Sequence, residues 1–183
     1  MKLERLLNSE ELQHHNSNQN ITDICLDSRS VKNGNLFFLL ERNIQLQEQY
    51  LKQAINNGAA AIIAPKEFTF DGTAINTPII KVDSVRKTLS QVSSKYYPKQ
   101  PKNILAITGT NGKTSVTKFT EEIWKLMGVK SASIGTLGIK YRKKFIKTKL
   151  TTPDIITLHK KLEELKKNKI DNVIIEASSH GLD

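Results

Sequence analysis

Residues 104–114 read Ile-Leu-Ala-Ile-Thr-Gly-Thr-Asn-Gly-Lys-Thr, and this stretch decides the expected fold. An apolar strand runs into a loop with two glycines, and the apolar spacing over residues 116–127 predicts an amphipathic helix directly after it. A strand, a glycine loop and a helix in this order are typical of a P-loop. The loop is a variant, because the general pattern G-x-x-x-x-G-K-[ST] has glycine where this chain has Ile107.

The residue types of the loop suit a phosphate. Gly109 and Gly112 let the backbone wrap around an anion without Cβ clashes. Successive N–H groups and the start of the helix offer positive potential to that anion. Lys113 is placed to reach the β- and γ-phosphates, and the Thr114 hydroxyl to ligate Mg²⁺. The alternative is a glycine turn that starts a helix beside an incidental lysine.

An acidic residue follows another apolar run. Glu176 closes the run 173–175, and the carboxyl ends of parallel strands are where open α/β sheets bind ligands. Glu176 is therefore expected to hold Mg²⁺ opposite Thr114, although such a residue alone is more often a solvated one. Ser178, Ser179 and His180 come next; on their own they indicate a turn and a structural histidine, and no G-x-S-x-G elbow supports a nucleophile.

Two further segments have competing interpretations. Thr151-Thr152-Pro153-Asp154 precedes a helix from residue 155, and capping by Thr152 or Asp154 explains it about as well as ligand binding does. Residues 140–149 hold six basic residues in ten, which suits nucleic-acid phosphates, but an exposed basic ribbon is the interpretation that we favour.

Two prolines, at positions 98 and 101, mark the clearest boundary, because proline disfavours helix in the residue before it. We expect a domain junction there, giving parts 1–98 and 99–183. The first part alternates apolar runs at 21–26, 36–40, 59–64 and 79–82 with helical patterns at 47–57 and 84–97, which predicts a small α/β unit. The second part repeats strand and helix, with strands at 129–134 and 173–175, and predicts a mostly parallel, doubly wound sheet.

Composition limits the partners. The chain has 183 residues, 28 basic and 18 acidic, for a net charge of +10. Residues 99–183 hold 17 basic and 8 acidic residues, a net +9, which suits a polyanion such as a nucleotide. Aromatic residues, at 6%, are few for a base-stacking surface. One cysteine excludes a disulfide framework, and we see neither a signal peptide nor an apolar run that crosses a bilayer, so a cytoplasmic protein is expected.

The motifs together resemble a family. GTNGKT at 109–114, TTPD at 151–154 and EASSHGL at 176–182 are similar to the Mur ligases, the ATP-dependent amide-bond ligases of peptidoglycan precursor synthesis. The segments 27–29 (Asp-Ser-Arg) and 34–37 (Gly-Asn-Leu-Phe) resemble the N-terminal UDP-binding domain of the MurE type. That type adds the third amino acid, diaminopimelate or lysine, to UDP-N-acetylmuramoyl-L-alanyl-D-glutamate. The resemblance covers the chain from about residue 20.

The resemblance implies a role for each matching residue. It implies that residues 1–98 are the UDP-binding domain and residues 99–183 the first part of the ATP-binding domain. The implied ATP-binding residues are Gly109, Thr110, Asn111, Gly112, Lys113, Thr114 and Ser115. The implied contacts to the UDP-muramoyl substrate are Leu26, Ser28, Thr151, Thr152 and Ser178. Lys113, Glu176 and His180 are the implied catalytic residues, and Thr114 and Glu176 the implied Mg²⁺ ligands.

The implied chemistry is activation of a carboxylate by ATP to an acyl phosphate, followed by attack of an amine. It needs a UDP-muramoyl dipeptide and an amino acid, with no nucleic acid and no membrane insertion, and leaves the oligomeric state open. Another superfamily member, such as a folylpolyglutamate synthase, and a non-catalytic ATP-binding module remain alternatives.

Two departures from the family pattern matter. Residues 41–47 (Glu-Arg-Asn-Ile-Gln-Leu-Gln) lack the glycine, histidine and Asp-Gly that the family usually has there. We therefore assign no contact with UDP to this loop. The family also continues well past the position of Asp183, so we expect a fragment that does not complete a ligation cycle alone. We further expect a sheet of about three strands in which the run ending at Glu176 lacks a neighbour, and hence a chain prone to aggregation.

Overall fold

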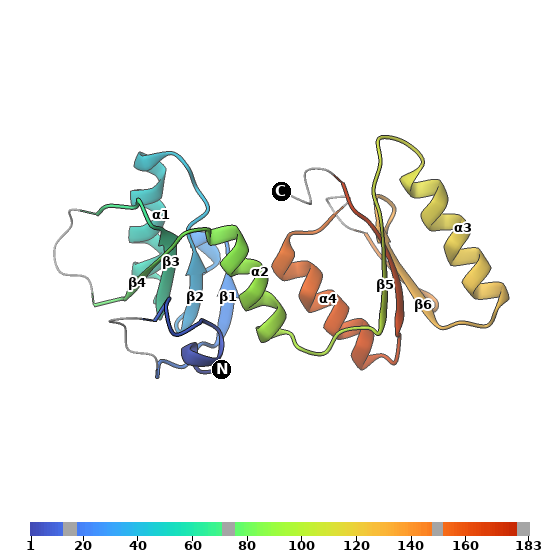
Figure 1. Cartoon of the computed structure of the whole chain (residues 1–183), viewed down its shortest axis with the longest axis horizontal. Helices are drawn as coiled ribbons and strands as arrows, with labels where there is room; N and C mark the ends of the chain where they lie inside the picture. Colours follow the sequence, from blue (N-terminus) through green and yellow to red (C-terminus); the bar gives the residue numbers. More distant parts are fainter. Residues whose placement is uncertain (13–17, 71–75, 148–151, 179–183) are drawn as a thin grey trace. The chain divides into compact units, whose positions relative to one another are not determined.

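The computed structural model describes residues 1–12, 18–70, 76–147 and 152–178 (Figure 1). The chain divides into two compact units, Met1–Tyr96 and Tyr97–Asp183, each with a sheet of its own. The division lies two residues before the junction expected after residue 98.

The first unit is built on four parallel strands in chain order. They are β1 (Asp23–Cys25), β2 (Asn35–Phe38), β3 (Ala61–Pro65) and β4 (Ile79–Val82), with helices α1 (Ile44–Asn56) and α2 (Val85–Tyr96) and the short 3₁₀ turns η1 (Leu3–Arg5) and η2 (Ser28–Ser30). All four residues of β2 are buried, as expected of a central parallel strand that is covered on both faces.

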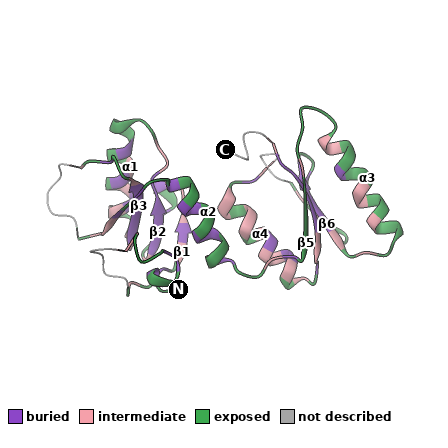
Figure 2. Ribbon diagram, viewed as in Figure 1, coloured by how far each residue is buried: buried purple, intermediate pink, exposed green. Residues whose placement is uncertain are grey.

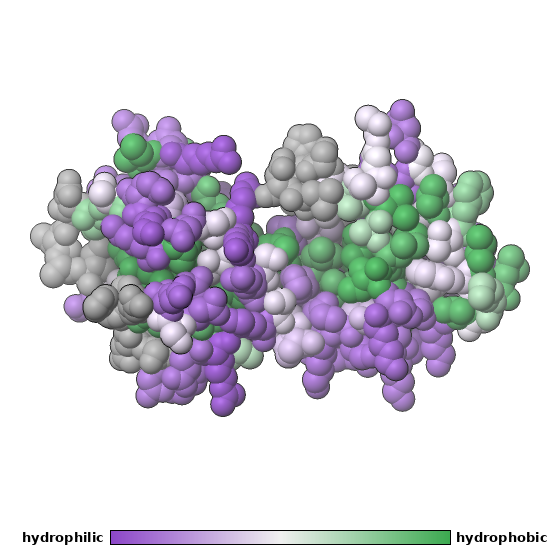
Figure 3. Space-filling view, viewed as in Figure 1, coloured by the Kyte–Doolittle hydropathy of each residue, from purple (hydrophilic) through white to green (hydrophobic). Residues whose placement is uncertain are grey.

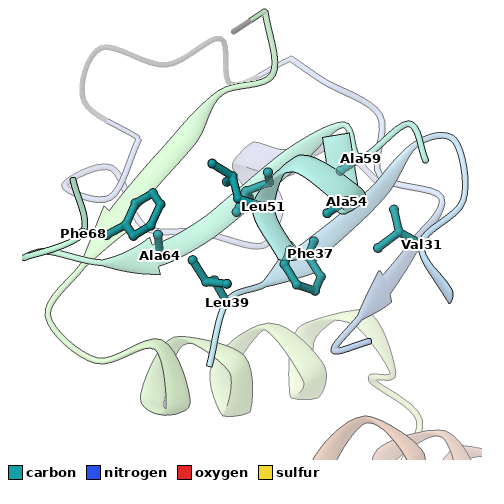
Figure 4. Packing of buried hydrophobic residues seen from close by; sticks show 9 residues of the cluster. Val31, Phe37, Leu39, Leu51, Ala54, Ala59, Ala64 and Phe68 are labelled. Carbon is teal, nitrogen blue, oxygen red and sulfur yellow. The ribbon is translucent and has the colours of Figure 1, made fainter. Parts of the chain in front are cut away.

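Local chemistry sets where α1 begins. The Asn43 side chain accepts hydrogen bonds from the backbone N–H groups of Gln45 and Leu46 and so caps the first turn. The helix therefore starts three residues before the apolar pattern at 47–57 suggests. It places Leu51 and Ala54 on the sheet, where they pack with a cluster of buried apolar side chains (Figure 4).

The second unit is built on five strands in the order β5-β9-β6-β7-β8. They are β5 (Asn103–Ile107), β6 (Ser131–Gly135), β7 (Gly138–Tyr141), β8 (Lys144–Ile146) and β9 (Asn172–Glu176), with helices α3 (Lys113–Leu126) and α4 (Ile155–Lys167). Strands β5, β9 and β6 are parallel, while β7 and β8 continue the sheet antiparallel. The mostly parallel α/β fold is thus confirmed, and the described part of the basic segment, residues 140–147, belongs to the β7–β8 hairpin and the residue after it.

Helices lie on opposite faces of the second sheet, as in a doubly wound fold (Figure 1). Leu162 and Leu165 of α4 pack against Val173 and Ile175 of β9. Because side chains alternate along a strand, Glu176 points to the other face, where its carboxylate contacts α3.

One expectation about this sheet is wrong. The strand that ends at Glu176, β9, is not an edge strand, because it pairs with β5 on one side and β6 on the other. The sheet has five strands among the described residues, not three. The apolar run at 173–175 predicts a buried strand, but the pairing order depends on how the α4 crossover returns the chain, which no local pattern encodes.

Among the described residues, no helix combines the length and apolar character that a membrane span requires.

Candidate functional site

The loop between β5 and α3 is the segment that the sequence predicts to bind phosphate. Gly112 precedes the first residue of α3 with φ +81°, in the left-handed region that favours glycine. A Cβ at this position would meet nothing within 4 Å, so the backbone conformation and not crowding requires glycine. Since α3 begins directly after the loop, its first N–H groups have no acceptor within the helix and lie at the end of the loop.

The lysine of the loop is turned toward the loop itself. Lys113 Nζ donates hydrogen bonds to the carbonyl oxygens of Gly109, at 2.5 Å, and Thr110, at 3.5 Å. Two neutral carbonyls are weaker partners for an ammonium group than a phosphate oxygen, because charge-assisted hydrogen bonds are about twice as strong as neutral ones. The Lys113 ammonium group therefore lies beside the loop, on partners that a bound phosphate could replace.

A cleft of about 350 Å³ opens on the loop. It is lined by residues 110–115 together with Thr136 and Ser178. Thr136 follows β6 and Ser178 follows β9, so the cleft lies at the carboxyl ends of parallel strands. This is where open α/β sheets place their ligands.

A buried carboxylate adjoins the loop. Glu176 is 2% exposed, and its Oε2 atom accepts hydrogen bonds from the hydroxyls of Thr114, at 2.9 Å, and Thr136, at 2.8 Å. A buried charge needs such partners, because desolvation without them costs several kcal/mol. The two threonines therefore fix the orientation of the carboxylate.

Gly135 makes room for that carboxylate. A Cβ on Gly135 would lie 2.4 Å from Glu176 Oε1, 2.5 Å from its Cδ and 2.7 Å from its Cγ. Any other residue at this position must displace the Glu176 side chain. The end of β6 thus shapes the site through one glycine and one threonine.

A second pair of hydroxyls, those of Thr152 and Ser178, lies at the end of β9. Thr152 Oγ1 donates to the backbone carbonyl of Glu176, at 2.8 Å, and accepts from the backbone N–H of Ser178, at 3.0 Å. The Thr152 and Ser178 hydroxyls are 3.1 Å apart. Asp154, not Thr152, caps α4, since its carboxylate accepts from the N–H of Thr157. Thr152 is thereby tied to the segment that follows β9.

The first unit holds the other predicted contacts. Ser28 is buried in η2, and its hydroxyl donates to Gln53 Oε1 at 2.7 Å. Asp27 and Arg29 flank it as an ion pair at 2.7 Å, and the hydrogen bond from Arg29 lowers the pKa of Asp27. Leu26 is half-buried at the end of β1. The Ser28 hydroxyl thus has a structural partner already.

The predicted residues separate into three groups. The loop 109–115, Glu176, Thr152 and Ser178 lie together in the second unit, while Leu26 and Ser28 belong to the first. Thr151 and His180 lie outside the described residues.

Sequence reasoning missed two residues of this site, Gly135 and Thr136. Their signal was present, because they follow the strand expected at 129–134 and so fall at the same sheet edge as the loop.

Comparisons with known proteins agree with this geometry. Residues 107–183 match the family described as the Mur ligase middle domain. The UDP-N-acetylmuramoyl-L-alanyl-D-glutamate–2,6-diaminopimelate ligase of Bradyrhizobium diazoefficiens is 40% identical over 163 residues, covering 89% of this chain and 33% of that protein.

Solved structures share the fold. A structure of a UDP-N-acetylmuramoyl-L-alanyl-D-glutamate–2,6-diaminopimelate ligase superposes with a TM-score of 0.81 at 25% identity, covering 100% of this chain and 37% of that one. The MurF ligase of Thermotoga maritima, solved in complex with ADP, shares the fold with a TM-score of 0.52 at 18% identity, covering 88% of this chain and 32% of that one. The chain spans about a third of the length of the relatives that it matches. With a P-loop variant, a buried strand-end glutamate and these relatives in agreement, the chain belongs to the Mur ligase family.

Proposed function

We propose that this chain contributes the UDP-binding unit and the phosphate-binding part of an ATP-dependent amide-bond ligase of peptidoglycan precursor synthesis. The cleft at the β5–α3 loop carries the proposal, because it brings a phosphate-type loop, Lys113 and a buried carboxylate to one edge of a parallel sheet. The implied substrates are a UDP-muramoyl dipeptide and an amino acid, diaminopimelate or lysine, in the cytoplasm. The name of the Bradyrhizobium diazoefficiens relative states this substrate class for that protein, which supports the proposal.

The donor set at the loop suits Mg²⁺. Thr114 and Glu176 offer a hydroxyl and a carboxylate oxygen 2.9 Å apart, both hard ligands of the kind that Mg²⁺ prefers. Among the described residues no group of three His, Cys, Asp or Glu side chains gathers around a metal position. This is consistent with Mg²⁺ arriving with ATP, since Mg²⁺ commonly takes one or two protein ligands and completes its shell with phosphates and water.

The proposed reaction has two steps. A carboxylate oxygen of the UDP-muramoyl dipeptide attacks the γ-phosphorus of ATP, and ADP leaves. The amine of the incoming amino acid then attacks the acyl carbon, phosphate leaves, and the amine gives up a proton. Lys113 and the N–H groups of the loop would stabilise the charge on the transferred phosphoryl group, so the contribution of this unit is positioning and electrostatic.

Titration with Mg·ATP tests the phosphate assignment. Calorimetry on the wild type, Lys113→Ala and Lys125→Ala compares the loop lysine with an exposed lysine at the other end of the same helix. Lys113→Ala is expected to weaken binding at least about tenfold, because a charge-assisted hydrogen bond contributes about 1.5–3 kcal/mol. Lys125→Ala is expected to bind like the wild type. Equal binding by wild type and Lys113→Ala would remove the phosphate role.

A non-catalytic ATP-binding module is the second candidate, since phosphate binding at the start of a helix does not by itself require turnover. Phosphate release separates the two. Release that depends on the UDP-muramoyl dipeptide and diaminopimelate supports the ligase, while Mg·ATP binding without any release supports the module. Release driven by a folate and glutamate, and not by the muramoyl compound, would favour a folylpolyglutamate synthase instead.

A further inference from the structure

Helix α3 carries a buried hydroxyl that no described residue satisfies. Thr117 is 5% exposed, and its Oγ1 atom has no hydrogen-bond partner in the part of the chain that the structure describes. Thr120 of the same helix instead donates to the carbonyl oxygen of Val116, at 2.9 Å, which is a common partner for a hydroxyl within a helix. Buried polar groups are nearly always paired, so an unpaired one indicates a bound water or ion.

The face of α3 that carries Thr117 lies against the sheet. Thr114 and Glu121 share this face, because residues three and four apart are neighbours on a helix, and they contact Glu176 of β9 and Ser133 of β6. The large apolar side chains of α3 form an exposed stripe on the opposite side: Val116, Phe119, Ile123, Leu126 and Met127. Hydrophobic residues accordingly gather on the surface of the second unit where α3 lies (Figure 3), and most of the helix is exposed or half-buried, in contrast to β9 (Figure 2). The face of α3 toward the sheet is therefore polar.

A small cavity lies between this polar face and the sheet. Its lining includes Thr117 and Glu121 of α3, Ser133 and Gly135 of β6, and Glu176 of β9. The cavity leaves about 10 Å³ for a water-sized molecule, which is close to the space that one water needs. A cavity of this size, with several polar groups around it, suits a single bound water.

Glu176 presents one of its two carboxylate oxygens to the cavity. The hydrogen bonds from Thr114 and Thr136 both end on Oε2. Oε1 lies beside Gly135, which lines the cavity, since a Cβ on Gly135 would be 2.4 Å from this oxygen. Oε1 is thus the oxygen that can accept a hydrogen bond from a water in the cavity.

We propose that Thr117 is a positioning residue for Glu176 and acts through one buried water in this cavity. The water accepts from the Thr117 hydroxyl and donates to Glu176 Oε1. Its second hydrogen goes to the Ser133 oxygen, which donates to Glu121 at 3.1 Å and still has lone pairs to accept with. Three hydrogen bonds are typical of a buried water.

A metal ion is a poorer occupant of the cavity than water. Lys118 and Lys140 also line it, and their ammonium groups repel another cation. Mg²⁺ in addition keeps several waters of its own, for which about 10 Å³ leaves no room.

The water gives the Glu176 carboxylate a donor at each oxygen. The carboxylate then keeps one orientation, with Oε2 toward Thr114 and the loop. The consequence for Mg²⁺ rests on the proposed function, in which Thr114 and Glu176 hold the metal. Groups that orient a metal ligand commonly change metal affinity by about 10–100-fold.

Urea unfolding tests the link between Thr117 and Glu176 without ATP or Mg²⁺. Thr117→Val removes the hydroxyl at nearly the same shape, and Thr117→Ser keeps it. The matched control is Thr120→Val, which removes a hydroxyl that bonds within the same helix. The folding equilibrium constant of Thr117→Val is expected to fall at least about fivefold, with Thr117→Ser close to the wild type. In a Glu176→Ala background the loss from Thr117→Val is expected to vanish, while Thr120→Val has the same effect in both backgrounds.

Three results of this unfolding experiment would overturn the proposal. An unchanged or more stable Thr117→Val would show a hydroxyl without a water, because removing an unsatisfied polar group does not destabilise. A loss that persists in the Glu176→Ala background would show that the hydroxyl acts on another group. A coupling that appears in potassium chloride, and not in choline chloride at the same ionic strength, would identify a cation as the occupant.

The Mg²⁺ requirement of ATP binding tests the consequence for the metal. The Mg²⁺ concentration that half-saturates ATP binding is expected to rise about tenfold in Thr117→Val and to stay at the wild-type value in Thr117→Ser and Thr120→Val. An unchanged requirement in Thr117→Val overturns the positioning role. A wild type that binds no Mg·ATP contradicts the proposed function instead, and the unfolding cycle then still decides whether Thr117 positions Glu176.

Discussion

Replacing Gly135 with alanine should disturb the buried carboxylate next to the loop. The new Cβ would lie 2.4 Å from Glu176 Oε1, whereas ordinary contacts begin at 3.4 Å, so the carboxylate must move by about 1 Å. Its hydrogen bonds from Thr114 and Thr136 are 2.9 and 2.8 Å long, and a shift of that size stretches or breaks them. Overpacking costs about 1–3 kcal/mol and each hydrogen bond to a charged group about 1.5–3 kcal/mol. Allowing for partial relaxation, we expect the free energy of unfolding to fall by about 2–4 kcal/mol.

Urea unfolding followed by the fluorescence of Trp124 measures this change. Trp124 is the single tryptophan of the chain and lies in α3, so its signal reports the second unit. Gly128→Ala is the matched control. Gly128 also has a positive φ, +70°, but a Cβ there meets nothing within 4 Å, so its cost of about 1–2 kcal/mol is backbone strain alone.

A double-mutant cycle with Glu176→Ala tests the cause. The three atoms nearest the added Cβ all belong to the Glu176 side chain beyond its Cβ, and Glu176→Ala removes them. In that background Gly135→Ala is expected to be nearly neutral, a coupling of at least about 1.5 kcal/mol, while Gly128→Ala keeps its full cost. A cost of Gly135→Ala that stays within about 0.5 kcal/mol in both backgrounds would refute the reasoning.

Three further outcomes follow from the same contacts. Thr136→Val removes one hydroxyl from Glu176 and is expected to lower unfolding stability by about 1.5–3 kcal/mol, measured in urea, with Thr136→Ser close to wild type. Thr152→Val leaves the backbone N–H of Ser178 without its acceptor and is expected to cost about 1–3 kcal/mol in the same assay. Burial lowers the pKa of His159 below 6.5, so folding stability is full above that pH and declines as pH falls through it, because the unfolded chain takes up the proton first. His159→Gln is expected to flatten the change in melting temperature between pH 8 and pH 5, and an unchanged slope would exclude His159 as its source.

Much of the second unit follows from local patterns. The strand at 104–108, the loop at 109–114 and the helix after it appear as β5, the β5–α3 loop and α3, because apolar periodicity and glycine positions encode them directly. The placement of Glu176 beside Thr114 was also predicted, since carboxyl ends of parallel strands meet at one edge. The second hydroxyl that holds Glu176, that of Thr136, required the structure, because nothing local links residue 136 to residue 176.

Two differences have a common cause. The helix α1 begins at Ile44 and not at residue 47, because the capping side chain of Asn43 decides its start and the apolar pattern does not report capping. The strand β9 lies inside the sheet and not at its edge, because strand order depends on the path of the crossover. In both cases the outcome depends on an interaction that the periodicity of apolar residues does not encode.

The sequence by itself determined the fold class and the division into two units, because each depends on residue types at short spacing. Only the tertiary structure decided which strand is open. It shows that none of the described residues covers β5 or the apolar side chains at 116–127, while β9 pairs with a strand on each side. The physical reason is that the exposure of a side chain depends on which other residues of the folded unit pack against it. The stripe at 116–127 indicates an apolar helix face, and only the packed unit reveals that this face points away from its own sheet.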